Sequence, residues 1–593
     1  MYNNFKLPID FNEGKQIDEN IINDLNLKNK NFLDNIKDFF SPTSLNKKDV
    51  SCNILFEKDE TCLYDCIFQP DNIFAKLSSN LLSNKYSTNE KFLKDTQKLT
   101  TKFSSVKFNK FDFENSLQLI EMVNNIKNES NFIEKYQYLE IPFLKDLNNN
   151  SSFLQILSIY NLFSPAINIL TPVFLLFLPF ILLIFQNQNL SIQNYLDQLF
   201  IIFQNNPLGK LFFSNLNIST SQKCTNLFWG FLYVFQIYNS IIYCLKFFKN
   251  IKIIHDKISL INRYLIDSLD NFNKLKTLLI PFKTYNEFSN QVEEIISKVN
   301  MLLKNINKIS EYEVKPSKLI ELGDLMKIFY DLHNDEDINN TLVNTYFLNG
   351  YIDNLVNLST LEAEKNINDC KFNKDNKTII DDNYYPIFLK EEKIKNSIDL
   401  CNNIIITGPN ASGKTTLIKS FLFNIIFSQQ FGKGFYKSAN INIFDKFFCY
   451  LNIPDTNDRD SLFQAEARIC KNIIEYIEEN KDEKYLCIFD ELYSGTNPDE
   501  AVNSSFSLLT YLAEENCKYI ITTHFYKLCS LLDKNSEIKN FHMKVITKND
   551  DLKFTYKLEK GISKIKGATN ILKKLNYPEK IINNLQLMND SKF

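Results

Sequence analysis

The 593-residue chain lacks a strong charge of either sign, because 67 Lys and Arg nearly balance 70 Asp and Glu. A formal net charge of −3 gives no global basic field, so any contact with nucleic acid must come from a local patch. The opening MYNNFKLPIDFNEGK has no basic segment followed by an apolar run and predicts no secretory signal peptide. The length is sufficient for roughly three or four domains.

Clusters of metal-ligating residues are also missing. The 12 cysteines are scattered singly, and the closest pair, Cys62 and Cys66, has no second pair or histidine group near it. This spacing argues against a zinc site and a disulfide framework, and it suits a reducing compartment. Cys487 lies in a predicted apolar strand and is expected to be an ordinary core residue.

The most informative stretch is NNIIITGPNASGKTT, residues 402–416. Its isoleucines predict a buried strand, and the segment after them fits GxxxxGK[ST], a phosphate-binding loop. In such a loop the glycines aim backbone N–H groups at an anion, the lysine reaches the β- and γ-phosphates, and the Thr hydroxyl binds Mg²⁺. The next helix, from Leu417 to about Phe427, adds its positive N-terminal end. We therefore expect ATP and Mg²⁺ to bind at Gly408, Pro409, Asn410, Ala411, Ser412, Gly413, Lys414, Thr415 and Thr416.

Two later apolar strands each end in polar residues. Tyr485–Phe489 leads into Asp490 and Glu491, and Tyr519–Thr522 leads into Thr523 and His524. Asp490 is expected to hold Mg²⁺ through water, and Glu491 to orient or deprotonate the attacking water. His524 could bond the γ-phosphate. The predicted catalytic residues are therefore Lys414, Glu491 and His524, which we expect to lie together at the carboxyl edge of a parallel sheet.

The order GPNASGKTT, DSLFQAEARI (460–469), CIFDELYSGTNPDEA (487–501) and ITTHFYKL (521–528) resembles the MutS family of mismatch-repair ATPases. NFHMKV (540–545) and residues 558–582 are similar to that family's final strand and closing helices, and residues 384–386 and 394–400 to its entry strands. The likeness covers about 384–585. It is vaguer over the helices of 250–365 and undetectable before about 140.

The resemblance implies an ABC-type ATPase head that works as a dimer and, in the family, binds mismatched DNA. Ser461 would reach the γ-phosphate of the partner's site, and His542 would pack near the adenine. The chain departs from the family pattern at Ala411–Ser412, at Leu462 and at Tyr385, where Met-Gly, Thr and His are usual. Phe11-Asn12-Glu13 lacks the setting of a mismatch-reading Phe-x-Glu, so the mismatch-reading module is expected to be missing.

A long uncharged stretch, residues 147–196, precedes the helices. Within it, Ala166–Phe185 has the length that a bilayer core requires, and proline is tolerated there in membrane helices. Leu227–Leu245 is a weaker second span, followed by Lys246, Lys249 and Lys252, which place both termini and the ATP site in the cytoplasm. The alternative is a hairpin buried in a large soluble core.

These observations predict a fold in four parts. Residues 1–150 form a mostly helical domain, 160–248 a transmembrane hairpin, 249–370 an all-α core and lever region with a break at Ile280–Pro281, and 384–593 an α/β P-loop NTPase domain of the ABC type. The polar segment 366–383 is expected to mark a boundary before the ATPase domain.

The predicted function is a membrane-associated, MutS-related ATPase working as a homodimer, with the hairpin in place of the family's DNA clamp. Mismatched-DNA binding is implied by the family alone. The alternatives are a mechanical switch on a membrane that does not act on DNA and, less favoured, a transporter-like ABC subunit. Two weak spans and the lack of an LSGGQ-like stretch count against the transporter.

Overall fold

The computed structural model describes residues 5–29, 62–187, 189–205, 220–389, 393–451, 462–548 and 551–563, with isolated residues between 572 and 584. The chain divides into two units. Unit 1 contains residues 1–117, 270–296 and 343–593, and unit 2 contains residues 118–269 and 297–342. Helices α6 (Phe113–Lys127), α11 (Thr220–Leu279), α12 (Asn286–Ile306) and α14 (Glu336–Ala363) contribute to both.

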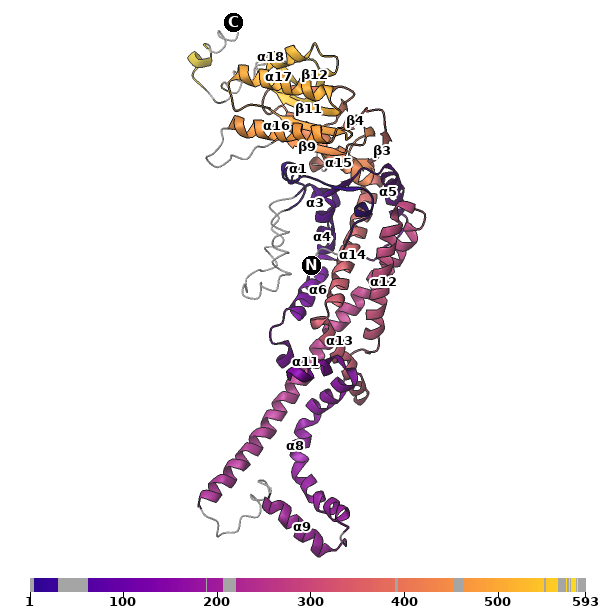
Figure 1. The fold of residues 1–593 in the computed structure, drawn as a ribbon, viewed down its shortest axis with the longest axis vertical. Coiled ribbons are helices and arrows are strands. Elements are labelled where there is room, and N and C mark those ends of the chain that lie inside the picture. Colours follow the sequence, from indigo (N-terminus) through magenta and orange to yellow (C-terminus); the bar gives the residue numbers. More distant parts are fainter. Residues whose placement is uncertain are drawn as a thin grey trace. The chain divides into compact units, whose positions relative to one another are not determined.

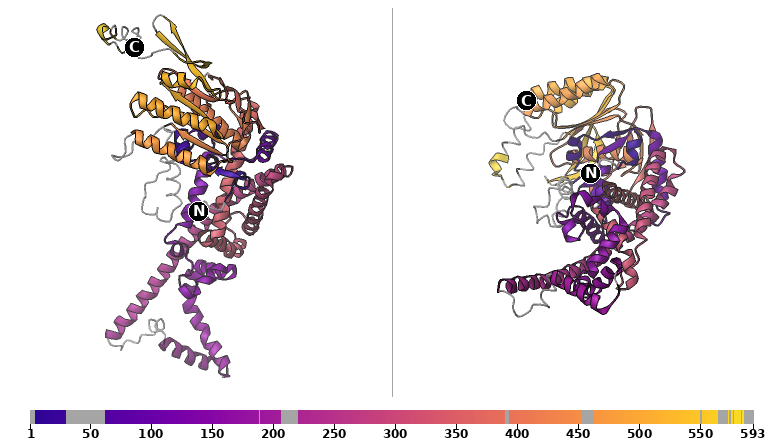
Figure 2. Two further views of the ribbon diagram at one scale, coloured as in Figure 1. Left: turned by 45° about the horizontal axis from the view of Figure 1, so that its top comes forward. Right: turned by 60° about the horizontal axis from the view of Figure 1, so that its bottom comes forward.

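The centre of unit 1 is a six-stranded sheet of order β13-β12-β6-β11-β10-β9. All neighbouring strands in it are parallel except β12 and β13, which form an antiparallel hairpin at one edge (Figures 1 and 2). The strands are β6 (Asn403–Thr407), β9 (Lys446–Tyr450), β10 (Tyr485–Asp490), β11 (Cys517–Thr523), β12 (Ile538–Lys548) and β13 (Asp551–Lys560).

Buried β-branched and aromatic residues explain why the middle strands form. Ile404, Ile405 and Ile406 of β6 are at most 1% exposed, and Cys487 of β10 is fully buried, as expected. A parallel sheet needs helices on its faces, and α15–α18 supply them. These helices are α15 (Lys414–Phe431), α16 (Leu462–Glu479), α17 (Pro498–Glu514) and α18 (Tyr526–Leu532).

A second, five-stranded sheet has the order β5-β4-β8-β3-β7. Two of its strands, β3 and β4, lie in the polar segment 366–383 that was expected to mark a boundary. Of the two expected entry strands, residues 396–399 form β5, but Tyr384–Pro386 leads into a 3-10 turn, because proline cannot donate to a strand ladder. The strands are β3 (Asn368–Asn373), β4 (Ile379–Asn383), β5 (Asn396–Asp399), β7 (Lys433–Gly434) and β8 (Ser438–Asn442).

The N-terminal part of unit 1 is small and mainly helical. It packs on α15, since the Tyr64 hydroxyl donates to Gln430 and the side-chain amide of Gln430 donates to the Leu82 carbonyl at 2.9 Å. Its elements are β1 (Gly14–Gln16), α1 (Glu19–Asp24), α3 (Leu63–Phe68), α4 (Ile73–Leu82), β2 (Lys85–Ser87) and α5 (Glu90–Phe103).

Unit 2 is helical, and its longest elements carry the predicted spans. The first span lies in α8 (Ser151–Phe185), and α9 (Ile192–Asn205) follows it inside the segment expected to connect the spans (Figure 1). The second span lies in α11, which continues without a break to Leu279, so the boundary predicted at 248–249 falls within one helix. The helix ends just before Pro281, as the sequence predicts. Unit 2 also contains α7 (Phe132–Lys135) and α13 (Leu322–Asn334).

Candidate functional site: a glycine loop at the carboxyl edge of the sheet

The loop between β6 and α15 is shaped by its glycines. Gly408 has φ 157° and Gly413 has φ 93°, backbone angles that residues with a Cβ rarely adopt. A Cβ on Gly408 would lie 2.8 Å from the Ser412 Oγ atom. That Oγ atom is buried and has no hydrogen-bond partner among the described residues. An unsatisfied buried hydroxyl beside a turn of backbone N–H groups fits a loop that binds an anion.

Lys414 curls back over this loop instead of extending into solvent. Its Nζ atom donates to the Gly408 carbonyl at 3.0 Å and lies 3.3 Å from His524 Nε2 and 3.9 Å from Glu491 Oε1. The side chain is 6% exposed. Burial lowers the pKa of Lys414 below its ordinary value, and the negative charges of Glu491 and Asp490 oppose that shift. The chain thus holds a largely desolvated cation at the start of the helix.

Thr415 and Asp490 are in direct contact. The Thr415 hydroxyl donates to Asp490 Oδ2 at 2.7 Å, and the Thr522 hydroxyl donates to the other carboxylate oxygen. Hydroxyl and carboxylate oxygens are the ligands Mg²⁺ prefers, and it usually completes its octahedral shell with water and substrate phosphates. The donor set therefore fits the predicted metal site. Thr522, which the sequence analysis did not single out, orients the carboxylate.

Glu491 and His524 are also in direct contact. His524 Nε2 lies 2.6 Å from Glu491 Oε1, and the Glu491 N–H donates to the Thr522 carbonyl at 3.1 Å. Glu491 has φ 52°, an uncommon conformation for this residue that turns the chain sharply after β10. The hydrogen bond from His524, followed by the positive charges of His524 and Lys414, lowers the pKa of Glu491 despite its partial burial. Its carboxylate therefore stays ionised at neutral pH.

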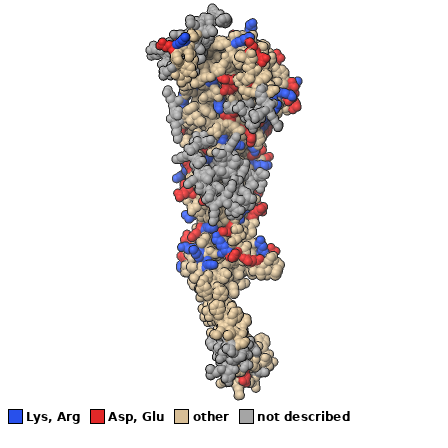
Figure 3. Space-filling view, turned by 90° about the vertical axis from the view of Figure 1, so that its left-hand side faces the viewer, with Lys and Arg blue, Asp and Glu red and all other residues tan. Residues whose placement is uncertain are grey.

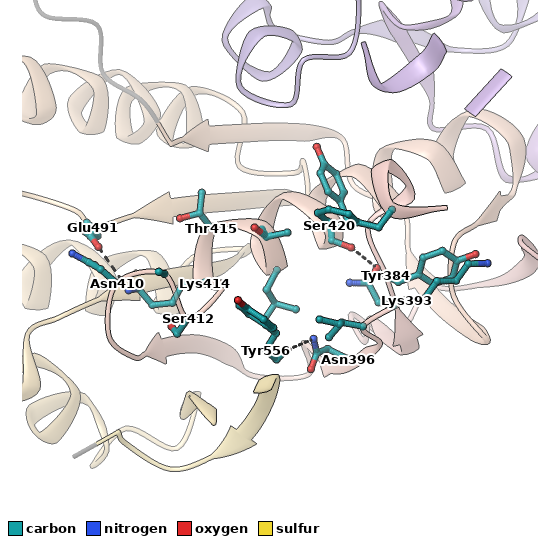
Figure 4. A pocket seen from close by; sticks show the side chains of 18 residues that line it. Tyr384, Lys393, Asn396, Asn410, Ser412, Lys414, Thr415, Ser420, Glu491 and Tyr556 are labelled. Atoms are coloured by element: carbon teal, nitrogen blue, oxygen red, sulfur yellow. Dashed lines mark hydrogen bonds and ion pairs between the residues drawn. The ribbon is translucent and has the colours of Figure 1, made fainter. Parts of the chain in front are cut away.

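A cavity of about 580 Å³ opens beside the loop, and Figure 4 shows the side chains around it. Residues 410–417 and Glu491 form one side of the lining, and Tyr384, Tyr385 and Phe388 contribute aromatic rings on another. Tyr556, from β13, also lines it, and its carbonyl accepts a 3.0 Å bond from Asn396. No periodicity in the sequence signals Tyr556, because the pairing of β13 with β12 places it there.

The other predicted residues have different positions. The carbonyl of Pro409 lies 3.4 Å from Lys414 Nζ, while Pro409 itself does not line the cavity. His542 lies on β12 in register with Thr407, outside the lining, with Nε2 4.0 Å from Glu559. Its Nδ1 atom is buried without a hydrogen bond among the described residues. Ser461 lies outside the described residues.

One carboxylate that the sequence analysis passed over supports the loop after Glu491. Glu466, on α16, is 1% exposed. Its oxygens accept hydrogen bonds from the backbone N–H groups of Ser494 at 3.2 Å and Gly495 at 3.4 Å. It stands within the DSLFQAEARI segment, but its target lies 28 residues further along the chain, beyond the reach of local patterns.

Glu466→Ala is therefore expected to lower the melting temperature. Loss of the acceptor removes two hydrogen bonds to a charged group at a cost of about 2 kcal/mol, which corresponds to a fall of roughly 2 to 3 °C in a unit of this size. Glu475→Ala, which removes an exposed 3.3 Å ion pair with Lys471 on the same helix, is the matched control and should change it by about 1 °C or less. Equal melting temperatures for both variants would contradict the role given to Glu466.

Comparison with known families agrees with this geometry. Residues 404–591 match the family model of MutS domain V. This match and the similarity to MutS and MutS2 proteins support the MutS family for the C-terminal region of the chain, which carries the glycine loop and the carboxylates. The mixed α/β sheets and the largely helical remainder fit a MutS-like architecture.

Individual relatives cover this same region. The DNA mismatch repair protein MutS of Persephonella marina is 27% identical over 241 residues, or 39% of this chain and 27% of that protein. Endonuclease MutS2 of Staphylococcus haemolyticus is 29% identical over 37% of this chain and 28% of its own length. The DNA mismatch repair protein spellchecker 1 of Drosophila melanogaster is 28% identical over 35% of this chain and 23% of its own. The chain thus spans about a quarter of the length of these curated relatives.

Proposed function

We propose that this chain is a MutS-related ATPase that binds ATP with Mg²⁺ at the glycine loop and hydrolyses it. The observation that carries the proposal is the convergence of two contact groups from three separate strand ends. Lys414, Glu491 and His524 lie within 3.9 Å of one another, and Thr415 contacts Asp490 beside them. Such convergence at the carboxyl edge of a parallel sheet is typical of nucleotide sites.

Each residue then has a distinct task. Lys414 and the loop N–H groups bind phosphate oxygens, and the orphan hydroxyl of Ser412 supplies a further donor. Thr415 and Asp490 would hold Mg²⁺, whose charge offsets that of the phosphates when it is bound. The ionised Glu491 carboxylate accepts a proton from the attacking water, and His524 orients that carboxylate from 2.6 Å. The rings of Tyr384, Tyr385 and Tyr556 offer apolar surface to the base.

We further propose that two heads associate through their ATP sites, so that Ser461 of one copy completes the site of the other. Two relatives are named as DNA mismatch repair proteins, which supports DNA as one target of the closed dimer. The alternative is a mechanical switch that acts on a membrane and not on DNA. Binding of the full chain to a mismatched and to a matched DNA duplex, each with ATP and at the same salt concentration, distinguishes these two functions. Tighter binding to the mismatched duplex supports repair, and equal binding to both duplexes supports the switch.

Membrane association is the remaining part of the proposal. The apolar windows of α8 and α11 have mean hydropathies of 2.6 and 1.3, and only 11% of each window is buried. That exposure favours lipid over the alternative of a hairpin buried in the chain's own core. Pro165, Pro172 and Pro179 lie inside α8, where a membrane helix tolerates them. Labelling of the 186–226 segment in sealed membranes tests the topology, and reactivity from the cytoplasmic side would overturn it.

The chain's single tryptophan makes insertion directly measurable. Trp229 lies on α11, 44% exposed, near the start of the second span. It stands about 26 Å along the helix from Lys246, so it should lie near the far interface. In vesicles that contain brominated phosphatidylcholine, its fluorescence should fall by about half or more. Fluorescence equal to that in unbrominated vesicles, together with release of the chain by alkaline carbonate, would contradict membrane insertion.

A further inference from the structure

A second cavity, of about 280 Å³, lies within unit 2 at the base of the hairpin. Leu162 of α8, together with Phe248, Ile251 and His255 of α11, forms one part of its lining. The segment between α12 and α13, residues 312–322, forms the rest. Most of this lining is apolar, and the charged groups come from the 312–322 segment. The cavity therefore combines an apolar wall with a polar one.

The 312–322 segment is tied to α8, which fixes the shape of the cavity. Gln155 of α8 donates to the Leu319 carbonyl and accepts from the Gly323 N–H at 2.7 Å. Ser151 donates to Asp324 at 2.8 Å. These bonds connect the start of α8 to α13 and the residues just before it, so the cavity has a defined shape within the unit.

The polar side of this cavity has hydrogen-bond donors that lack an acceptor among the described residues. His255 is 8% exposed, and its ring has an edge contact with Tyr312 at 5.4 Å but no hydrogen bond among the described residues. Lys318 is 16% exposed, donates to the Ser310 hydroxyl and lies 3.5 Å from Glu321, which leaves one of its three N–H groups without a partner in the described part of the chain. Lys315 pairs with Glu313 at 2.5 Å. Lys315, Lys318 and Glu313 line the cavity and carry one net positive charge, which the Glu321 carboxylate behind Lys318 balances from outside the lining.

A stripe of lysines on α11 adds net positive charge beside this cavity. Lys246, Lys249 and Lys252 follow the second span at intervals of three residues, and all three are exposed. No ion pair involves them within the part of the chain that the structure describes. Figure 3 shows Lys and Arg side chains, with Asp and Glu among them, just above the uncharged surface of the hairpin. Such a stripe is typical of segments that contact anionic lipids at the cytoplasmic surface.

We propose that this cavity binds an anionic phospholipid from the cytoplasmic leaflet. Its acyl chains would lie along Leu162 and Phe248, and its phosphate would bind Lys315 and Lys318 with His255 and Tyr312 as further donors. The proposal rests on the membrane association proposed above. It adds a specific lipid site to an otherwise unspecific apolar surface.

The depth of the cavity favours a lipid over a soluble anion. Leu162 lies four residues before the first span and Phe248 three residues after the second, or about 6 and 4.5 Å along their helices. The polar headgroup region of one leaflet is roughly 5–8 Å thick. The cavity therefore lies at headgroup depth, where a phosphate and the first acyl carbons of a lipid are both within reach.

The test uses the full chain with a reporter in the cavity. The double variant Trp229→Phe/Phe248→Trp moves the only indole into the lining, and it is reconstituted in phosphatidylcholine vesicles. About one lipid in ten is brominated, either as phosphatidylglycerol or as phosphatidylcholine. We expect quenching at position 248 to be at least about threefold stronger with the brominated anionic lipid. Adding Lys315→Ala/Lys318→Ala should abolish the difference, whereas Lys371→Ala/Lys374→Ala, the same charge change on exposed sites of unit 1, should preserve it.

The native Trp229 separates two kinds of failure. Suppose that Trp229 is quenched in the native chain. If both brominated lipids then quench the indole at position 248 equally, or if the stronger quenching by phosphatidylglycerol persists without Lys315 and Lys318, the lipid site is wrong and the membrane proposal survives. If Trp229 is not quenched by either lipid, the membrane proposal fails and the lipid site fails with it. A wild-type circular dichroism spectrum for each variant establishes that it is folded.

Discussion

Replacing Lys414 with alanine should weaken ATP binding by at least about a hundredfold, or about 2.8 kcal/mol. The reason is the position of the ammonium, which is 6% exposed and lies 3.0 Å from the Gly408 carbonyl. A cation about 4 Å from a phosphate charge contributes roughly 4 kcal/mol at an effective dielectric constant of about 20. The ammonium is already desolvated in the folded chain, so little of that gain is lost on binding.

Equilibrium binding of a fluorescent ATP analogue to the full chain measures this effect. Lys419→Ala is the matched control, because it removes the same group from the same helix, outside the cavity lining. Its affinity should stay within about twofold of the parent. A folded Lys414→Ala variant that binds ATP within about threefold of the parent would show that the glycine loop is not the nucleotide site.

Replacing Glu491 with glutamine should slow hydrolysis by about a hundredfold to ten-thousandfold while ATP still binds. The amide keeps the size of the side chain and can still bond His524, but it cannot accept a proton from water. The backbone N–H at this position stays bound to the Thr522 carbonyl at 3.1 Å, so the site keeps its shape. Nucleotide recovered from the variant after incubation should be almost entirely ATP.

Phosphate release under single-turnover conditions measures the loss. Glu500→Gln makes the same chemical change on α17, at an exposed carboxylate that accepts a 2.9 Å bond from Thr496, and should leave the rate unchanged. Hydrolysis by Glu491→Gln at the parent rate would remove Glu491 from the role of base. His524 would then be the next residue to examine, since its Nε2 also lies 3.3 Å from Lys414.

The parts of the site that the sequence predicted share one physical reason. Lys414, Asp490 and His524 each stand at or just beyond the end of a strand or loop, and parallel strands bring their carboxyl ends to one edge. The sharp break before Pro281 was equally predictable, because proline cannot continue a helix. Local chemistry therefore determined these features.

Other features depend on tertiary contacts that no local pattern encodes. Tyr556 reaches the cavity because β12 and β13 pair antiparallel with a register shift between Met543 and Val545. Glu466 supports a loop on another element. β3 and β4 form in a polar segment because β8 pairs with both of them, which overrides weak strand propensity.

We propose above that ATP joins two copies of this chain through their glycine-loop sites. Glu491→Gln, which should retain ATP, allows the most direct measurement: the molecular mass of the full chain in detergent, by analytical ultracentrifugation, with and without ATP and Mg²⁺. We predict that the molecular mass of Glu491→Gln doubles when ATP and Mg²⁺ are added. The double variant Glu491→Gln/Lys414→Ala should keep the mass of one copy under the same conditions. One copy at every ATP concentration that saturates binding would contradict the account.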